Sequence, residues 1–496
     1  MKKLTIHMFL VLFFASLVGC EKYLDQQPKF ALTESNGITN YAKAKAAVNG
    51  IYSTFRNDSW SGALYVAQTT KAGFINFSSV ADYNLSYTQE SGGGSAIWSA
   101  FYRSLNAANF AITGIEALPQ TAFTNNEQRN SLLGEAKAVR AWINLNILWN
   151  FGYWWAEDAS PYGLVFRDKP ASLDNVRAPR ISVGESYRII NEDLDFAIQH
   201  ASQFDSPRYI SKQFAQVLKA KALLYRSGYR NETEPLKQAL TLINNVMEQA
   251  SSKFQLQSDL AQVYQRSWES PENLFVKYLE DDGSRTSAGG YWYTYGIIYQ
   301  GNTLPLAPGG ARTAGLRYGT DWFTGDPRWP IATGEVRAPE TWDNTFRYTF
   351  KKLARLGSYQ GKVNSPVDEK YATYYFRFAE LYLLKAELLA RTGASVAQAI
   401  APINELRQKR TAQAFNLLQP GNQEQLYDAI FKEIFLELCL ENGSEFFASI
   451  RFKKDNQPWI VAIKDGLTFD ITRVSWPIPN SEIINNPAAF QNPGQE

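Results

Sequence analysis

The chain has 496 residues, of which 45% are hydrophobic and 14% are aromatic, and its formal net charge at pH 7 is only +2. Lys and Arg are interleaved with Asp and Glu along the chain, so the sequence has no basic stretch of the kind that binds a polyanion. This composition predicts one well-packed globular body and excludes nucleic acid as a partner.

The first residues have the order of a secretory signal peptide, with Lys2 and Lys3 followed by an apolar run at 8–18. The run is too short for a transmembrane helix, which needs ~20 apolar residues. Leu-Val-Gly-Cys at 17–20 has the form of a bacterial lipobox, in which the cysteine is diacylated after cleavage just before it. Because two acyl chains hold a protein firmly at a membrane, we expect a signal peptide at 1–19 and lipidation at Cys20. The alternative is a plain signal peptide with an incidental cysteine.

Helical periodicity dominates the rest of the chain. A short tether at 20–33 precedes the first expected helix. The expected helices are 38–56, 97–118, 126–151, 183–201, 211–229, 235–250, 374–392, 396–410 and 423–441. The helix expected at 374–392 has two apolar faces and ends before Gly393, where a second helix follows, so we expect neighbours on both sides.

Two such helical hairpins carry small residues where helices would cross, which is typical of degenerate tetratricopeptide-like repeats. The small residues are Ala220, Ala222, Ala386 and Ala390. Between the hairpins, 251–370 is rich in Gly, Pro and aromatic residues and is too long for an ordinary loop. We therefore expect a mainly α fold, a tetratricopeptide-like helical repeat scaffold with an irregular, loop-rich second lobe. In this division 34–250 is the N-terminal repeat region, 251–370 is a ligand-binding lobe, and 371–496 completes the helical body.

Catalytic and metal-binding motifs are mostly missing from the sequence. After signal cleavage His200 is the single histidine, which excludes a zinc-binding HExxH helix, and no P-loop, CxxC pair or GxGxxG follows a strand. We therefore expect no catalytic residue, metal or cofactor. Cys439 lies in an apolar helical stretch and is expected to pack as a small hydrophobe. A carboxylate pair for glycoside hydrolysis stays open, because 48 acidic residues allow many pairs.

Two predicted loop regions carry more aromatic residues than helix packing requires. An aromatic ring on a loop can stack on the C–H face of a sugar while polar neighbours bind its hydroxyls. The candidate ligand-binding residues are Trp60, Tyr83, Tyr87, Trp292, Tyr293, Tyr295 and Arg312. The alternative is that alternating tyrosines at 291, 293 and 295 are core-facing strand residues.

Several separated motifs, in this order, give the chain a specific resemblance. They are the lipobox with Glu-Lys-Tyr-Leu-Asp at 21–25, Trp98-x3-Tyr102-Arg103, Gly-Glu-Ala-Lys-Ala-Val-Arg-Ala at 134–141, Asp326-Pro327-Arg328, Arg-Phe-Ala-Glu-Leu at 377–381, Ile-Asn-Glu-Leu-Arg at 403–407 and the Pro-rich tail from Trp476. In these features the sequence resembles the SusD/RagB family of surface lipoproteins. It departs from the family pattern at 432–438, where the family usually carries Glu-Arg-Arg before Glu-Leu.

The resemblance implies an all-helical repeat scaffold that lies as a lid on a SusC-like TonB-dependent transporter in the outer membrane. It also implies oligosaccharide binding without catalysis. Three alternatives remain at this stage: a peptide-binding lipoprotein of the same uptake type, a hydrolase using two carboxylates, and a scaffold that binds only the transporter.

Overall fold

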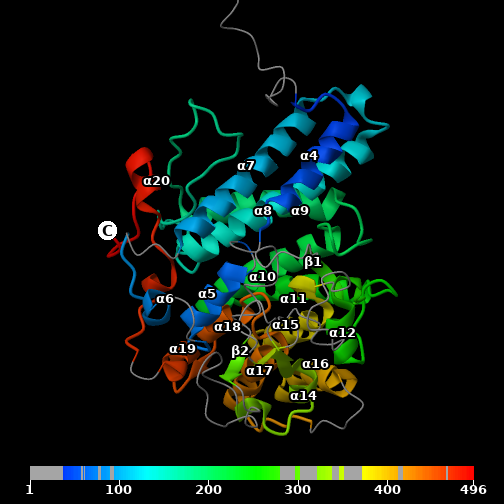
Figure 1. The fold of residues 1–496 in the computed structure, drawn as a ribbon, viewed down its shortest axis with the longest axis vertical. Coiled ribbons are helices and arrows are strands. Elements are labelled where there is room, and N and C mark those ends of the chain that lie inside the picture. Colours follow the sequence, from blue (N-terminus) through cyan, green and yellow to red (C-terminus); the bar gives the residue numbers. More distant parts are fainter. Residues whose placement is uncertain are drawn as a thin grey trace, which may run out of the picture.

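The computed structural model describes residues 37–56, 60, 62–75, 80–89, 94–279, 297–301, 321–337, 346–350, 371–410, 417–464 and 467–496 (Figure 1). Most of this part of the chain is helical, which confirms the mainly α fold and its tetratricopeptide-like scaffold. Of the helices described, none is both long and apolar enough to cross a membrane.

Polar side chains cap the beginnings of the N-terminal helices. Asn40, Asn125, Ser182 and Ser211 each accept a hydrogen bond from the backbone N–H three residues further on, which satisfies a donor that the helix itself leaves unpaired. The helices of this half are α4 (Tyr41–Ser53), α5 (Gly62–Ala72), α6 (Val80–Asn84), α7 (Ser95–Ala117), α8 (Asn126–Phe151), α9 (Val183–His200), α10 (Lys212–Arg230), α11 (Thr233–Glu248) and α12 (Leu260–Arg266), with short 3-10 turns η2 (Gln120–Ala122) and η3 (Ser267–Glu269).

The C-terminal half continues the same helical body. Its elements are η4 (Asp321–Phe323), α14 (Trp329–Ala332), α15 (Phe378–Arg391), α16 (Val396–Arg410), α17 (Gln423–Leu438), α18 (Ser444–Arg451), α19 (Trp459–Ile463), η5 (Ile471–Val474) and α20 (Asn480–Asn485). Helices adjacent in sequence pack as hairpins, α8 with α9, α10 with α11 and α15 with α16, and α11 packs on α15. Stacking of hairpins buries a continuous core, as repeat scaffolds do.

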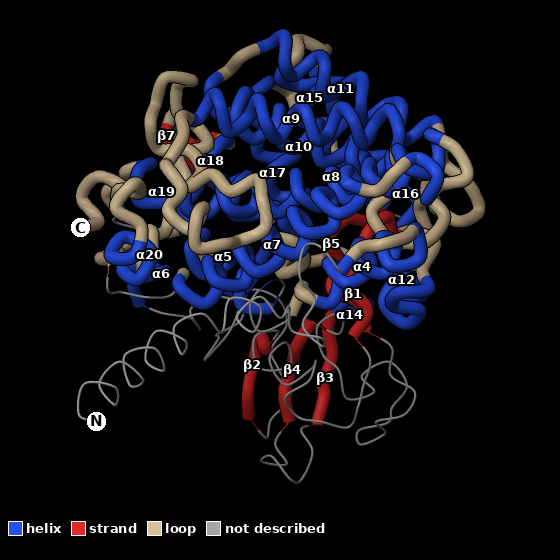
Figure 2. Tube along the Cα trace, turned by 90° about the horizontal axis from the view of Figure 1, so that it is seen from above, coloured by secondary structure: helices blue, strands red, loops and turns tan. Residues whose placement is uncertain are grey.

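The remaining regular elements of the described structure are short strands. They are β1 (Asn273–Leu279), β2 (Ile297–Gly301), β3 (Thr333–Arg337), β4 (Phe346–Phe350), β5 (Tyr371–Arg377), β6 (Lys453–Lys454) and β7 (Gln457–Pro458). All pairs are antiparallel: β1 with β5, β2-β4-β3 as one sheet, and β6 with β7. Figure 2 shows the three-stranded sheet projecting from one side of the helical body.

One expected helix boundary is wrong. The sequence predicts a helix from residue 374, but the chain stays extended through β5 and α15 begins only at Phe378. The aromatic side chains of Tyr374 and Phe376 favour a strand, and pairing of Phe376 with Phe275 of β1 supplies the hydrogen-bonding neighbour that a strand needs. The segment therefore leads from the sheet directly into the helical scaffold.

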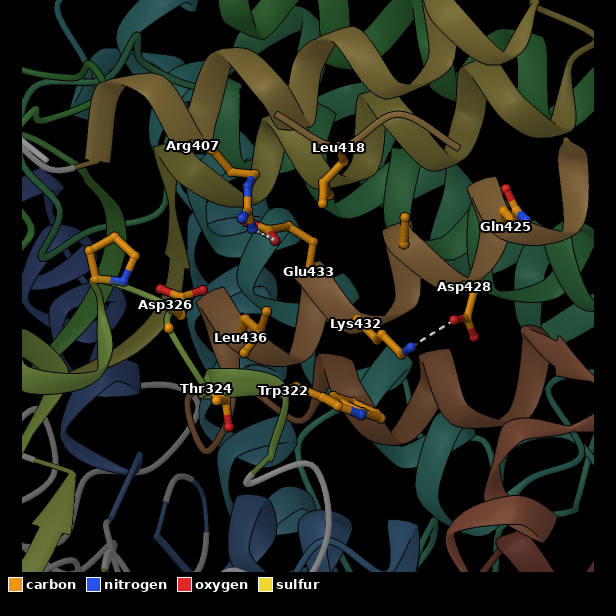
Figure 3. A pocket seen from close by; sticks show the side chains of 13 residues that line it. Trp322, Thr324, Asp326, Arg407, Leu418, Gln425, Asp428, Lys432, Glu433 and Leu436 are labelled. Carbon is orange, nitrogen blue, oxygen red and sulfur yellow. Dashed lines mark hydrogen bonds and ion pairs between the residues drawn. The ribbon is translucent and has the colours of Figure 1, made fainter. Parts of the chain in front are cut away.

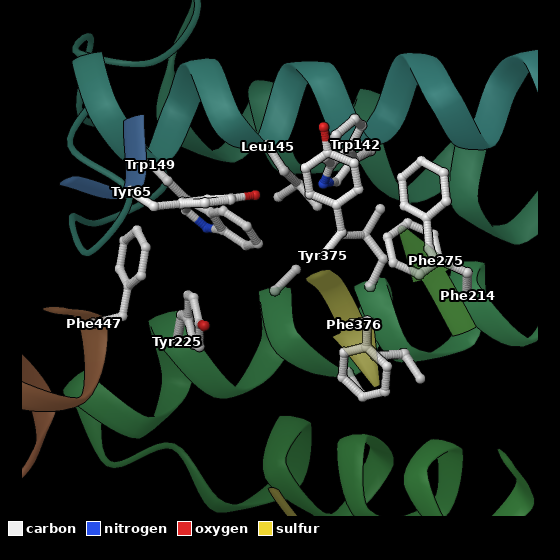
Figure 4. Packing of buried hydrophobic residues seen from close by; sticks show 14 of the residues in the cluster. Tyr65, Trp142, Leu145, Trp149, Phe214, Tyr225, Phe275, Tyr375, Phe376 and Phe447 are labelled. Carbon is white, nitrogen blue, oxygen red and sulfur yellow. The ribbon is translucent and has the colours of Figure 1, made fainter. Parts of the chain in front are cut away.

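Close helix approach and aromatic packing hold the body together. A Cβ atom on Gly134 of α8 would lie 2.8 Å from the backbone nitrogen of Ala201, so only glycine lets the end of α9 come this near. In the core (Figure 4), the ring centres of Trp149 of α8 and Tyr225 of α10 are 5.0 Å apart. The ring of Tyr225 stacks on that of Phe447 of α18, with 4.7 Å between the ring centres. Aromatic contacts of this kind add to the burial of apolar surface that stabilises the fold.

The described part of the chain contains one cysteine and one histidine. Cys439 is fully buried, as expected of a cysteine that packs as a small hydrophobe. His200 is the last residue of α9, and its ring lies 4.5 Å from the ring of Phe196.

Candidate functional site

A pocket of about 490 Å³ lies between the end of α4, the loop before α10, and strands β1 and β5. We call it the tyrosine pocket. Its lining residues are Asn49, Tyr52, Ser53, Phe55, Arg208, Tyr209, Phe275, Val276, Lys277, Tyr278 and Tyr375. Aromatic rings with a few polar groups at their edges are typical of a site for an amphipathic ligand such as a sugar.

Tyr52 anchors the wall of the tyrosine pocket. Its hydroxyl donates to Glu135 Oε1 at 2.7 Å and accepts from the backbone N–H of Ile210 at 2.9 Å. Burial, together with the nearby carboxylate of Glu135, raises the pKa of Tyr52 well above its usual value, so the phenol stays protonated. Tyr209 packs edge-on against Tyr52 at 5.3 Å and is 36% exposed, so this second ring is open to solvent.

Tyr278 of β1 also lines the pocket, and its ring contacts both Trp268 and Arg208. Its ring stacks on Trp268 at 4.5 Å, and the guanidinium carbon of Arg208 lies 5.4 Å from the centre of the same ring. The loop that carries Arg208 is tied to β1, because the N–H of Val276 donates to the carbonyl of Pro207 at 2.9 Å. The stack holds an aromatic ring and a cation next to each other in the pocket.

Positive charge distinguishes this pocket. Arg208 and Lys277 line it, and among the described residues no carboxylate does. Glu135 lies behind Tyr52. Burial raises the pKa of the Glu135 carboxyl, because its effect is larger than that of the hydrogen bond from Tyr52, which lowers this pKa. Arg208, which is exposed, therefore presents a positive charge to a ligand at this surface.

The structure places three of the predicted ligand-binding residues. Trp60 is fully buried, its Nε1–H donates to Ser104 Oγ at 2.9 Å, and its ring stacks on Trp142 at 4.6 Å. The prediction that Trp60 lies on a surface loop is therefore wrong: the ring fills the core and offers no face to a ligand. Tyr87 is 3% exposed and donates to Asp82 Oδ1 at 2.9 Å.

Tyr83 is only partly buried, and its backbone carbonyl accepts a hydrogen bond from Lys464 Nζ. It does not line the tyrosine pocket. Cys20, Trp292, Tyr293, Tyr295 and Arg312 lie outside the described residues, so their roles stay predictions.

Sequence reasoning missed the residues that form the pocket. Tyr52 has the spacing of an ordinary core residue of α4, and Tyr278 is the last residue but one of strand β1. Arg208-Tyr209, an adjacent cation and aromatic residue after Pro207 in a loop, is the one local signal that points to a site.

A second pocket, of about 470 Å³, lies along α17 (Figure 3), and we call it the α17 pocket. Its charged groups are compensated by one another. Lys432 pairs with Asp428 at 2.7 Å, and Arg407 pairs with Glu433 at 2.8 Å. Because these pairs already satisfy the charges, the α17 pocket offers a ligand less than the tyrosine pocket does.

Beneath the α17 pocket is a buried network of arginines and carboxylates that joins several of the sequence motifs. Arg328, of the Asp-Pro-Arg motif, contacts Asp326 and Glu433 at 2.7 Å each, and Glu437 at 3.1 Å. Arg377, which begins the Arg-Phe-Ala-Glu-Leu motif, contacts Glu437 at 2.7 Å. The motifs that are far apart in sequence therefore meet at α17.

The carboxylate of Glu437 in this network stays ionised. Burial by itself would raise the pKa of Glu437, but the guanidiniums of Arg410, Arg377 and Arg328 outweigh it and hold that pKa well below its usual value. The segment 432–438, where the sequence departs from the family pattern, thus carries Glu433 and Glu437 into the core as arginine partners. Within the described ranges, no group of three or more His, Cys, Asp or Glu side chains could hold a metal ion.

The fold and the pockets define a helical-repeat scaffold with a pocket lined by aromatic rings. The sequence model of the SusD family matches residues 223–494, more than half of the chain, and the protein belongs to this family. SusD-like protein P38 of Formosa agariphila is 24% identical over 99% of both chains. Two solved structures share the fold. A laminarin-binding SusD-like protein has a TM-score of 0.65 at 20% identity, covering 92% of this chain and 100% of that one. NanU of B. fragilis has a TM-score of 0.70 at 19% identity, covering 95% and 100%.

Proposed function

We propose that the protein is a cell-surface lipoprotein that binds an oligosaccharide and passes it to a SusC-like TonB-dependent transporter of the outer membrane. The observation that carries the proposal is the tyrosine pocket in a chain of the SusD family. One structural neighbour is a laminarin-binding SusD-like protein, and laminarin is a polysaccharide, which supports a glycan as the ligand.

The ligand would lie between the N-terminal repeat region at 34–250 and the irregular lobe at 251–370. Tyr52 and Tyr209 come from the first region, and Tyr278 comes from the second. Tyrosine rings can stack on the C–H face of a sugar, while Asn49 and Ser53 can meet its hydroxyls. The loop aromatics Trp292, Tyr293 and Tyr295, with Arg312, follow Tyr278 in the chain and are proposed to extend this surface.

Binding without chemistry fits the state of the buried carboxylates. Glu272, Glu433, Glu437 and Glu441 are each paired with arginine, so guanidinium groups occupy the carboxylate oxygens that a general acid would use to protonate a leaving group. We therefore propose no enzymatic activity for the chain.

Affinity electrophoresis of residues 21–496 with a panel of polysaccharides tests the proposal. We expect retardation by at least one polysaccharide and, on incubation, no shortening of that polymer by size-exclusion chromatography. Retardation by none would contradict glycan binding, and appearance of shorter products would contradict binding without catalysis. Co-purification of the full-length lipoprotein with an outer-membrane transporter tests the delivery step.

A further inference from the structure

We propose that the tyrosine pocket binds an acidic oligosaccharide, one that carries carboxylate or sulfate groups, and that Arg208 recognises the negative charge. This inference rests on the proposed function and adds to it the chemical class of the glycan. Both charged side chains that line the pocket, Arg208 and Lys277, are cations. A neutral sugar would gain little from this charge, whereas an anionic sugar would.

Arg208 is available to a ligand. Its side chain is exposed, and no carboxylate within the described part of the chain forms an ion pair with it. The acid closest to it in sequence, Asp205, is bound by Lys253 instead. This differs from exposed arginines elsewhere, such as Arg188, which pairs with Glu185 at 2.6 Å and also with Glu192.

The position of Arg208 is set before a ligand arrives. Its guanidinium lies over the ring of Tyr278, which in turn stacks on Trp268. A cation over a ring is attracted by the negative face of that ring, and the N–H groups at the guanidinium edge remain able to bind an anion. Backbone hydrogen bonds from Arg208 N to Ser206 Oγ and from Val276 N to Pro207 O hold the loop against β1. A preorganised guanidinium loses little freedom when it binds a carboxylate or sulfate.

The pocket is better suited to an acidic sugar than to an acidic peptide. Extended peptides commonly bind by adding a strand to an open sheet edge. One edge of β1 pairs with β5, and on the other the N–H of Val276 is already bonded to Pro207. The tyrosine rings and the polar groups of Asn49 and Ser53 match alternating C–H faces and hydroxyls instead.

A matched set of polymers tests the inference on residues 21–496. The probes are polygalacturonate, the same polymer after carboxyl reduction to neutral galactan, dextran and dextran sulfate, with binding measured by affinity electrophoresis and by calorimetry with the corresponding oligosaccharides. We expect at least one acidic probe to bind, its neutral counterpart to bind at least about tenfold more weakly, and the affinity to fall with added NaCl.

Arg208→Gln is expected to weaken binding of the acidic probe about tenfold, and Arg208→Lys by less, because lysine keeps the charge but loses the planar fork. Arg188→Gln, an exposed arginine on α9, is the matched control and is expected to leave affinity unchanged. Thermal melts check that each variant is folded. Unchanged affinity in Arg208→Gln, or equal binding of acidic and neutral forms, would overturn the inference while leaving glycan binding intact. Binding of an acidic peptide but of no glycan would overturn both the inference and the proposed function.

Discussion

Arg410 of α16 and Glu272, which immediately precedes β1, form a two-pronged pair in the interior, 138 residues apart in sequence. The Nη1 to Oε2 distance is 2.8 Å and the Nη2 to Oε1 distance is 2.5 Å, and both side chains are fully buried. The pair connects the irregular lobe to the C-terminal helices. The relative position of these regions therefore depends on an ion pair in which the charges of Arg410 and Glu272 compensate each other.

Removal of one partner of this pair should be costly. We expect Arg410→Met to lower the free energy of unfolding by about 3–5 kcal/mol, because Glu272 and Glu437 would each lose a guanidinium partner inside the protein. Urea denaturation followed by circular dichroism measures the change. Arg188→Met, at an exposed pair, should change it by less than about 1 kcal/mol. Equal effects in the two variants would contradict a structural role for the network.

The same network predicts loss of stability in acid. Glu272 and Glu437 have pKa values below the ordinary one in the folded protein, because the attraction of neighbouring arginines outweighs the effect of burial. A lowered folded pKa gives stability that is fully present above the unfolded pKa, near 4.5, and is lost as pH falls toward the folded value. We expect the midpoint of thermal unfolding to fall steeply below about pH 4.5. A flat profile between pH 5 and pH 3 would contradict this.

Lys71 predicts a second dependence of stability on pH, in the neutral to alkaline range. It is fully buried among aromatic rings, with Nζ 4.1 Å from the ring centre of Trp476, and no hydrogen-bond acceptor in the described structure meets Nζ. Burial lowers its pKa to about 7, although Asp82 opposes the shift. The unfolded chain therefore binds more protons than the folded protein from about pH 7 up to the ordinary lysine value, and stability should rise with pH over that range.

Lys71→Met should remove the part of this rise that comes from Lys71 and leave the part from Lys464, whose pKa burial also lowers to about 7. It should stabilise the protein at pH 7 by about 1–3 kcal/mol, since a buried cation without a hydrogen-bond acceptor is replaced by an apolar chain of similar length. Lys237→Met, at an exposed pair on α11, is the control and should change little. Thermal melts from pH 6 to pH 10 measure both. Destabilisation of Lys71→Met at every pH would show that the aromatic contacts of the cation outweigh its burial.

The aromatic residues that the sequence predicts as ligand contacts differ in role: Trp60 is a core residue, whereas Trp292 and Tyr295 are proposed ligand contacts. We expect Trp60→Ala to lower stability by about 3–5 kcal/mol, because it leaves a cavity beside Trp142 and Ser104. The double variant Trp292→Ala, Tyr295→Ala should instead weaken glycan binding about tenfold with no change in melting temperature. Unchanged affinity in the double variant would remove both residues from the proposed site.

Cys20 should determine where the protein is found. Cys20→Ser is expected to move the protein from the detergent phase to the aqueous phase in Triton X-114 partitioning, because it removes the site of two acyl chains. Mass spectrometry of the N-terminal peptide of the wild-type protein should show the acyl groups. Retention of Cys20→Ser in the detergent phase would contradict the proposed anchor.

Local sequence patterns determined the scaffold. The helices at 126–151 and 396–410 begin and end where the sequence predicts, because periodicity and turn residues act over a few neighbouring positions. The burial of Cys439 follows in the same way from its apolar helical context. The order of separated motifs was enough to indicate the family that the comparisons confirm.

Tertiary packing decided the sites. Tyr374 to Arg377 became a strand only because β1 lies alongside, and Trp60 became a core residue only because Trp142 and Ser104 surround it. The tyrosine pocket joins α4, the loop before α10, and β1, segments that no short sequence window contains. Sequence patterns report the preferences of neighbours along the chain, whereas a binding pocket and a buried ion network depend on which distant side chains the fold brings within a few ångströms of each other.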